Sequence, residues 1–215
     1  MSRGPGNGML EKLTLRSADG ATAECYLHGA HVTSWSPALS GGDEWLWLSE
    51  RSAFQPGAPI RGGIPVVFPQ FATEGPLPRH GFARTAIWEL ESMEEVASGQ
   101  VVATLSLTDS PETQAVWPYA FHATVAVRLG GDRLVVTLGV HNTGREDFTF
   151  TAALHSYLHV LDVDHVALVG LHGGQYREST APLEMKFDPD ESIRVEGWLD
   201  RLYVDAPKHL TLREG

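Results

Sequence analysis

Two neighbouring segments of the chain carry apolar side chains at every second position, and this pattern is the strongest constraint on the fold. It extends over residues 121–129 and returns over residues 134–140, with Gly130-Gly131-Asp132 between them. A period of two is the period of a β-strand, and a short glycine-containing link between two such runs is typical of a hairpin. The sequence therefore predicts a pair of antiparallel strands here.

The rest of the chain is divided into short segments by 22 glycines and 13 prolines. Residues 44–48, 101–107, 148–160 and 166–171 also favour strands, and we expect Trp45 and Trp47 to share a core-facing side. Only residues 92–97 and parts of 49–54 could hold a helical turn, because no window keeps a 3.6-residue period. The pattern predicts an all-β fold, a large antiparallel β-sandwich. We expect residues 1–8 to be a flexible tail and residues 9–215 to form one domain.

The charge balance and the single cysteine narrow the classes of partner and location. There are 16 Lys and Arg against 27 Asp and Glu, a formal net charge of −11. Nucleic-acid binding needs clustered cations, so we expect no nucleic-acid partner, whereas one anionic small molecule needs only a local pair of arginines. No apolar run approaches the roughly 18 residues that span a bilayer. Cys25 cannot form an internal disulfide, which fits a reducing compartment and predicts a cytoplasmic location.

Residues 55–84 do not fit the strand pattern. The segment contains six prolines and five glycines, and proline cannot donate a hydrogen bond to a sheet. It also carries Arg61, Arg79, His80 and Arg84. A loop of this length within a domain is more often functional than not, although a packed structural crossover is the alternative. We expect this segment to line a site.

Several common catalytic centres find no support in the sequence. His155 and His159 would lie roughly 13 Å apart along one strand, too far to share an ion, so we expect no metal. There is no serine elbow of the Gly-x-Ser-x-Gly type and no glycine-rich nucleotide motif, so we expect no cofactor. What remains is His80, His155, the arginines and the motif Asp200-Arg201-x-Tyr203, each of which could also be an ordinary strand or loop residue.

Three blocks of sequence resemble a known family. They are Arg61-Gly-Gly-Ile-Pro-Val-Val-Phe-Pro-Gln-Phe71, Arg79-His-Gly-Phe-Ala-Arg84, and Leu154-His-Ser-Tyr-Leu-His-Val160. Together they are similar to the signature of the hexose-6-phosphate mutarotases, also called glucose-6-phosphate 1-epimerases, of the aldose 1-epimerase superfamily. The resemblance implies the galactose mutarotase-like β-sandwich, and it runs from about residue 21 to the end of the chain.

The resemblance also implies an activity, the interconversion of the α and β anomers of a hexose 6-phosphate without a cofactor. A base removes the proton of the C1 hydroxyl while an acid protonates the ring oxygen, so that the ring opens and can close on the other face. By position in the motifs, His155 would be the general acid. His80 would hold the substrate near the reacting end and assist the developing charge.

The remaining roles implied by the resemblance concern substrate binding. Arg61 and Arg84 would hold the phosphate or hydroxyl groups, with Arg79 competing with Arg84 for that role. Gln70 would line the pocket, and Asp200 would bind sugar hydroxyls. The substrate class implied is a small phosphorylated sugar.

One part of the family pattern is missing from this sequence. The general base of the family is a glutamate on a strand that follows a Trp-Asn-Pro-Trp segment, and residues 1–215 contain neither element in that context. We therefore expect a sandwich that is incomplete at its C-terminus, whose uncovered sheet edges would favour self-association. The alternatives are that another chain completes the sheet or that the protein is a sugar-phosphate binder without the base.

A different class of function is also consistent with the residues. Six tryptophans could serve as stacking platforms in a non-catalytic carbohydrate-binding sandwich. Such a module requires an exposed aromatic face, whereas a mutarotase requires His80 and His155 to converge in one place.

Overall fold

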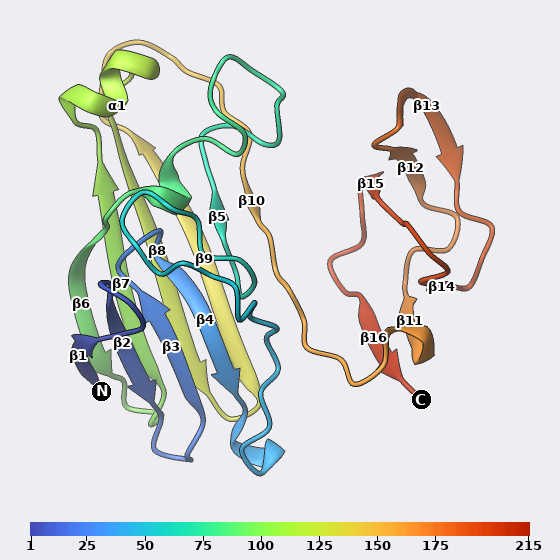
Figure 1. The fold of residues 1–215 in the computed structure, drawn as a ribbon, viewed down its shortest axis with the longest axis horizontal. Helices are drawn as coiled ribbons and strands as arrows, with labels where there is room; N and C mark the ends of the chain where they lie inside the picture. Colours follow the sequence, from blue (N-terminus) through green and yellow to red (C-terminus); the bar gives the residue numbers. More distant parts are fainter. The chain divides into compact units, whose positions relative to one another are not determined.

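The computed structural model describes residues 1–215, apart from the side chain of Pro182, and antiparallel strands dominate it (Figure 1). The chain divides into two compact units, Met1–His159 and Val160–Gly215. This division differs from the single domain expected from the sequence. Among the described residues, no helix is both long enough and apolar enough to cross a bilayer.

Two four-stranded antiparallel sheets make up most of the first unit. One sheet contains, in spatial order, β1 (Ser2–Pro5), β2 (Glu11–Arg16), β3 (Thr22–Tyr26) and β4 (His31–Ser36). The other contains β6 (Glu89–Glu95), β7 (Val101–Thr108), β8 (Phe121–Gly130) and β9 (Arg133–Asn142). Side chains of both sheets, such as Leu13, Cys25, Leu105 and Val125, belong to one buried cluster. The predicted β-sandwich is therefore present in this unit.

The predicted hairpin is confirmed. β8 and β9 pair from Phe121 opposite Asn142 to Gly130 opposite Arg133, which leaves a two-residue turn. Gly131, in that turn, has a φ of 64°, a left-handed conformation that glycine adopts without a steric penalty. The side chains that alternate on one face of β8, from Phe121 to Leu129, are at most 1% exposed, as the alternation predicted.

Residues expected in a flexible N-terminal tail instead form the edge strand β1. Ser2–Pro5 pairs with β2, with Ser2 opposite Thr14 and Pro5 opposite Glu11. Arg3 adds an ion pair with Glu11, at 2.7 Å. Proline tolerates this position because an edge strand leaves one row of backbone groups unpaired.

The expected long strand over residues 148–160 is broken up in the structure. Only Ala153–Leu154 is a strand, β10, and it pairs with β5 (Val66–Val67). The residues that flank β5 are Pro65 and Pro69, which accept hydrogen bonds from His155 and Thr151 through their carbonyls but have no N–H to return. The ladder therefore cannot extend beyond two residue pairs.

Buried and exposed side chains do alternate over residues 44–48, but the side that faces the core is the opposite of the one expected. Leu46 is buried, whereas Trp45 and Trp47 are 49% and 44% exposed. The expectation that both tryptophans belong to the core is therefore wrong. Leu46 and Leu48 make only isolated bridges, to Leu158 and Gly62, so no regular strand forms.

The second unit contains two three-stranded sheets. One has the order β14 (Ser192–Arg194), β11 (Val166–Val169), β16 (Thr211–Glu214). The other has the order β13 (Ala181–Phe187), β12 (Gln175–Glu178), β15 (Arg201–Val204). The helical elements of the chain are α1 (Pro111–Val116) and the 3-10 turns Ala38–Ser40, Ala83–Thr85 and Val163–His165.

Candidate functional site

The short strand β5 brings the two predicted histidines together. Leu154 of β10 lies opposite Val66, and the next residue, His155, donates its backbone N–H to the carbonyl of Pro65. At the other end of β5, Phe68 bridges to Gly81, which follows His80 directly. The imidazole centroids of His80 and His155 are 6.3 Å apart, with an interplanar angle of 77°.

His155 presents an exposed imidazole supported by aromatic rings. The ring of Tyr157 stacks on it at a centroid distance of 4.8 Å and an angle of 28°. Tyr157 in turn packs against Trp47, at 5.8 Å. The stack restricts the orientation of the imidazole while its edge stays open to solvent, an arrangement suited to exchanging a proton with a bound molecule.

His80 is buried, with 9% of its surface exposed, and has a φ of 71°. Its Nδ1 accepts the backbone N–H of Ala72 at 3.2 Å. Burial lowers the pKa of His80 below its usual range, and the positive charges of Arg84 and Arg79 lower it further. The ring is therefore neutral at neutral pH and suited to donating a hydrogen bond rather than carrying a charge.

Three arginines contribute positive charge to this region: Arg84 and Arg79 act on His80, and Arg61 acts on Arg84. Arg84 is half-buried, and its pKa is lowered first by burial and then by the positive charges of Arg61 and Arg79. Its Nη2 donates to the carbonyl of Arg79 at 2.8 Å, while its Nε is buried without a hydrogen-bond partner in the described structure. An anion bound at Arg84 would offset the positive charges of Arg61 and Arg79 that lower the pKa of Arg84.

The two glycines after Arg61 explain how the loop approaches the sheet so closely. Gly62 and Gly63 have φ values of 102° and 61°. A Cβ at these positions would lie 2.4 Å from the carbonyl oxygen of Trp47 and 2.2 Å from that of Val32. Only glycine permits this contact, which fixes the backbone at Arg61.

Gln70 lies beside the site, but its side chain bonds to its own loop. Its Oε1 accepts the N–H of Leu77 at 2.8 Å, and its Nε2 donates to the carbonyls of Leu77 and Ala72 at 3.0 and 3.2 Å. The amide therefore has no free N–H for a ligand. Gln70 does line a cavity of about 260 Å³, together with residues of its loop and of segment 149–151.

Asp200 belongs to the second unit, where it is exposed, and its carbonyl accepts the N–H of Ser179 at 3.2 Å. The two other residues of its motif are engaged with Asp188. Arg201 Nη1 lies 2.8 Å from Asp188 Oδ2, and the Tyr203 hydroxyl donates to the same oxygen. The motif thus contributes to a structural cluster around Asp188. The sequence did not indicate Asp188 as important, because its distinguishing property is its burial, at 1% exposed.

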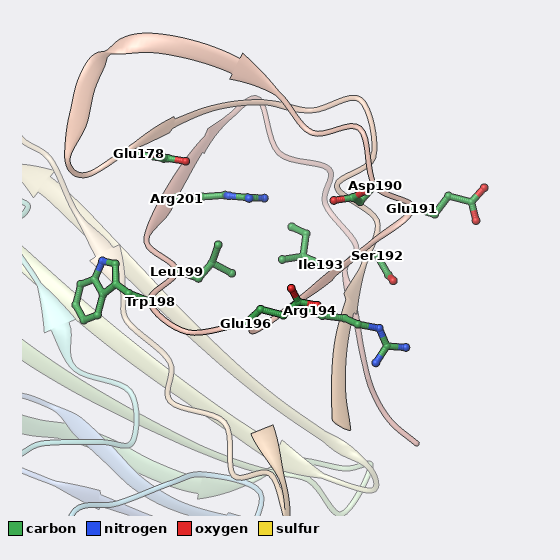
Figure 2. A pocket seen from close by; sticks show the side chains of 10 residues that line it. All are labelled: Glu178, Asp190, Glu191, Ser192, Ile193, Arg194, Glu196, Trp198, Leu199 and Arg201. Carbon is green, nitrogen blue, oxygen red and sulfur yellow. The ribbon is translucent and has the colours of Figure 1, made fainter. Parts of the chain in front are cut away.

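A cavity of the second unit is unsuited to an anionic ligand. It measures about 600 Å³ and is lined by the side chains shown in Figure 2, with Trp198, Arg194 and Arg201 among them. Its lining residues include four acidic residues and two arginines, so their net charge is negative. A phosphate would be repelled there, which favours the arginines of the first unit as the anion site. Within the described residues, no three His, Cys, Asp or Glu side chains gather closely enough to hold a metal ion.

A family model described as aldose 1-epimerase matches residues 11–214. The chain belongs to this family. The resemblance drawn from the sequence motifs is therefore confirmed, as is the predicted fold class. Curated relatives include a proposed glucose-6-phosphate 1-epimerase of Cenchrus ciliaris, 35% identical over 94% of this chain and 63% of its own length. Another, of Escherichia coli strain K12, is 42% identical over 67% of this chain and 47% of its own length.

Solved structures share the fold of this aldose 1-epimerase family member. A proposed mutarotase of Salmonella typhimurium superposes with a TM-score of 0.87 at 29% identity, covering 99% of this chain and 69% of its own. A galactose mutarotase-related enzyme of Lactobacillus acidophilus gives a TM-score of 0.77 at 20% identity, covering 94% of this chain and 73% of its own. The chain spans about half to two thirds of the length of the two curated relatives.

Proposed function

We propose that the protein interconverts the α and β anomers of a hexose 6-phosphate in the cytoplasm. One observation carries the proposal: the edge-to-face pair of His80 and His155 lies in a region where the charges of Arg84 and Arg79 act on His80 and that of Arg61 acts on Arg84. The histidines provide groups that can exchange or donate protons, and the arginines provide charge for a phosphate.

The ring-opening step assigns a separate task to each histidine. As the C1 hydroxyl loses its proton, its oxygen forms a carbonyl with C1, and the C1–O5 bond breaks. The electron pair of that bond goes to O5, which takes a proton from His155. His80, neutral and buried, donates a hydrogen bond to the oxygen on which charge develops. Rotation about C1–C2 and closure on the other carbonyl face give the second anomer.

The arginines hold the remote end of the substrate. Arg84 and Arg61 bind the phosphate, and Arg84 is the stronger candidate because it is half-buried and has an unpaired Nε. For Asp200, in the second unit, the family resemblance implies a role in binding sugar hydroxyls. The base that removes the C1 proton is, by the family resemblance, a glutamate that residues 1–215 do not contain.

Exchange spectroscopy tests the proposal on the complete natural protein that contains this sequence. The anomeric proton signals of glucose 6-phosphate should exchange faster with the protein than without it, and those of glucose should be less affected because glucose has no phosphate. An unchanged exchange rate for glucose 6-phosphate would overturn the proposal.

A non-catalytic carbohydrate-binding module is the second candidate, favoured by one observation. Trp198 is 85% exposed, and Trp45 and Trp47 are about half exposed, so aromatic faces are open to a sugar. Sugar binding to such a module would change the tryptophan fluorescence of the protein without accelerating anomer exchange. Binding together with faster exchange would exclude it as the whole function.

A further inference from the structure

Two hydrogen bonds between Ala72 and His80 close the loop that lies between these two residues. The backbone N–H of His80 donates to the carbonyl of Ala72 at 2.9 Å, and the N–H of Ala72 donates to the Nδ1 of His80 at 3.2 Å. Both residues have left-handed φ values, 47° and 71°, which side chains rarely adopt. The two residues therefore hold each other in a conformation that needs outside support.

Gln70 provides that support. Its Nε2 donates to the Ala72 carbonyl, the same oxygen that accepts the His80 N–H, and its other two bonds fix both backbone groups of Leu77. With 4% of its surface exposed, the amide is shielded from water that could replace these bonds. Its three hydrogen bonds therefore hold the loop at two points, one of them the residue bonded to His80.

The bond from Ala72 determines which nitrogen of His80 carries the proton. A backbone N–H can only donate, so Nδ1 must present its lone pair, and a neutral ring must then carry its proton on Nε2. The Nε of Arg79 lies 3.3 Å from that Nε2 and also donates. A neutral ring cannot accept at both nitrogens. Arg79 is exposed and can turn away, whereas the backbone N–H of Ala72 cannot.

We propose that Gln70 is a positioning residue that selects the Nε2-protonated tautomer of His80 by fixing Ala72. In this role Gln70 acts through Ala72 and His80 and does not contact the substrate. The choice of tautomer follows from the hydrogen bonds alone, and only its use in catalysis rests on the proposed function. In that tautomer His80 turns a hydrogen-bond donor toward the substrate oxygen. Without Gln70, Ala72 is released and Nδ1 loses its fixed donor, so both tautomers become populated.

Nitrogen-15 NMR of the imidazole tests this directly and needs no catalytic activity. Spectra of the ¹⁵N-labelled protein are recorded at mildly alkaline pH, where the ring is neutral, with the His80 signals assigned by a His80→Gln variant. The natural protein should show a protonated Nε2 and an unprotonated Nδ1. Gln70→Glu keeps the size of the side chain and removes both N–H donors, and it should shift both signals toward the average of the two tautomers.

Two further variants make the test complete. Asn142→Asp is the matched control, because the Asn142 amide spans its own turn by bonding Glu146 and Gly144, both at 2.9 Å, away from His80. It should leave the His80 signals unchanged. If Gln70→Glu does not fold, Gln70→Met removes the same bonds without adding a charge and takes its place.

Activity gives a second, separable result. If the protein accelerates anomer exchange, Gln70→Glu should lower the rate constant at saturating substrate by about 10- to 100-fold, the range seen when a residue that orients a metal-ligating imidazole is lost, with little change in KM. A natural protein with mixed tautomers, or a folded Gln70 variant with the natural tautomer, would overturn the inference. Loss of the proposed function alone would leave the NMR result standing.

Discussion

The contacts that stabilise the first unit internally differ in kind from those inside the second unit. In the first unit, the aliphatic side chains of β7 and β8 that face the core are fully buried. In the second unit, Leu183 is 99% exposed and Phe187 is 65% exposed, while the buried Asp188 bonds Arg201 and Tyr203. Apolar packing thus dominates one unit, and a directional polar cluster is prominent in the other.

The difference bears on where chemistry can be organised. A close-packed core resists displacement, so it can keep His80 and His155 at a fixed separation and hold arginines together despite their repulsion. Phe68 illustrates the connection, because it follows β5 directly and bridges to Gly81. Its ring centroid lies within 6.2 Å of those of Trp117, Phe121, Phe82 and Phe150. The scaffold of the site and the core of the first unit are therefore the same residues.

The largest effect on stability should follow from truncating a buried side chain in the core of the first unit. Phe68→Ala removes a fully buried ring and should lower the free energy of unfolding by about 3–5 kcal/mol. Leu183→Ala, the matched truncation in the second unit, should change it by no more than about 0.5 kcal/mol because the side chain is exposed. Urea denaturation of both variants measures the contrast, and equal losses would contradict the comparison.

A pH effect of somewhat smaller size should come from His31, which is buried in β4. Burial lowers its pKa to about 4, despite a hydrogen bond to the carbonyl of Gly62. Between about pH 6.5 and 4 the unfolded chain binds a proton there that the folded chain does not, so stability falls as pH falls. The loss reaches about 3 kcal/mol, because the pKa of His31 falls from its usual 6.5 to about 4 and each tenfold change in proton affinity is worth about 1.36 kcal/mol.

Denaturation curves across this pH range test the effect of His31. His31→Gln keeps a donor for the Gly62 carbonyl but cannot titrate, so it should flatten the dependence between about pH 4 and 6.5. If the natural protein and the variant lose stability in parallel, His31 does not contribute as described.

The smallest effect should come from the polar cluster of the second unit. Asp188→Asn removes the charge that Arg201 and Tyr203 share, and it should cost about 1–3 kcal/mol. Hydrogen exchange of the amides in β12 and β15 detects a loss confined to this unit. Asp190→Asn serves as control, since that side chain is exposed, and an equal effect in both would remove the distinction between the units.

Sequence alone predicted the parts of the fold that follow from local pattern. The hairpin of β8 and β9 needs only alternation and a glycine turn. The full burial of Cys25, which raises its thiol pKa to about 12, was visible only in the structure. Helix α1 was missed although its signal was present, because Ser110 caps the helix and Pro111 is its first residue. Residues 92–97, a possible helical turn, instead include the end of β6 because β7 pairs with them.

The site shows the same division between local and distant information. The motifs named His80 and His155, but their approach depends on β5 lying beside both, which no local pattern encodes. The bonding of Gln70 was beyond prediction for a related reason, since it requires the fold of the loop through Ala72 and Leu77. The inverted faces of Trp45 and Trp47 depend on which side of the segment meets the core, and alternation cannot decide that.

The central claim, that His155 transfers a proton within a substrate-binding site, is tested most directly by His155→Asn in the complete natural protein. Anomer exchange of glucose 6-phosphate is followed by NMR, and its affinity by calorimetry. The account predicts that exchange slows by about 10²- to 10⁴-fold while affinity is retained. An unchanged exchange rate in the folded variant would contradict it.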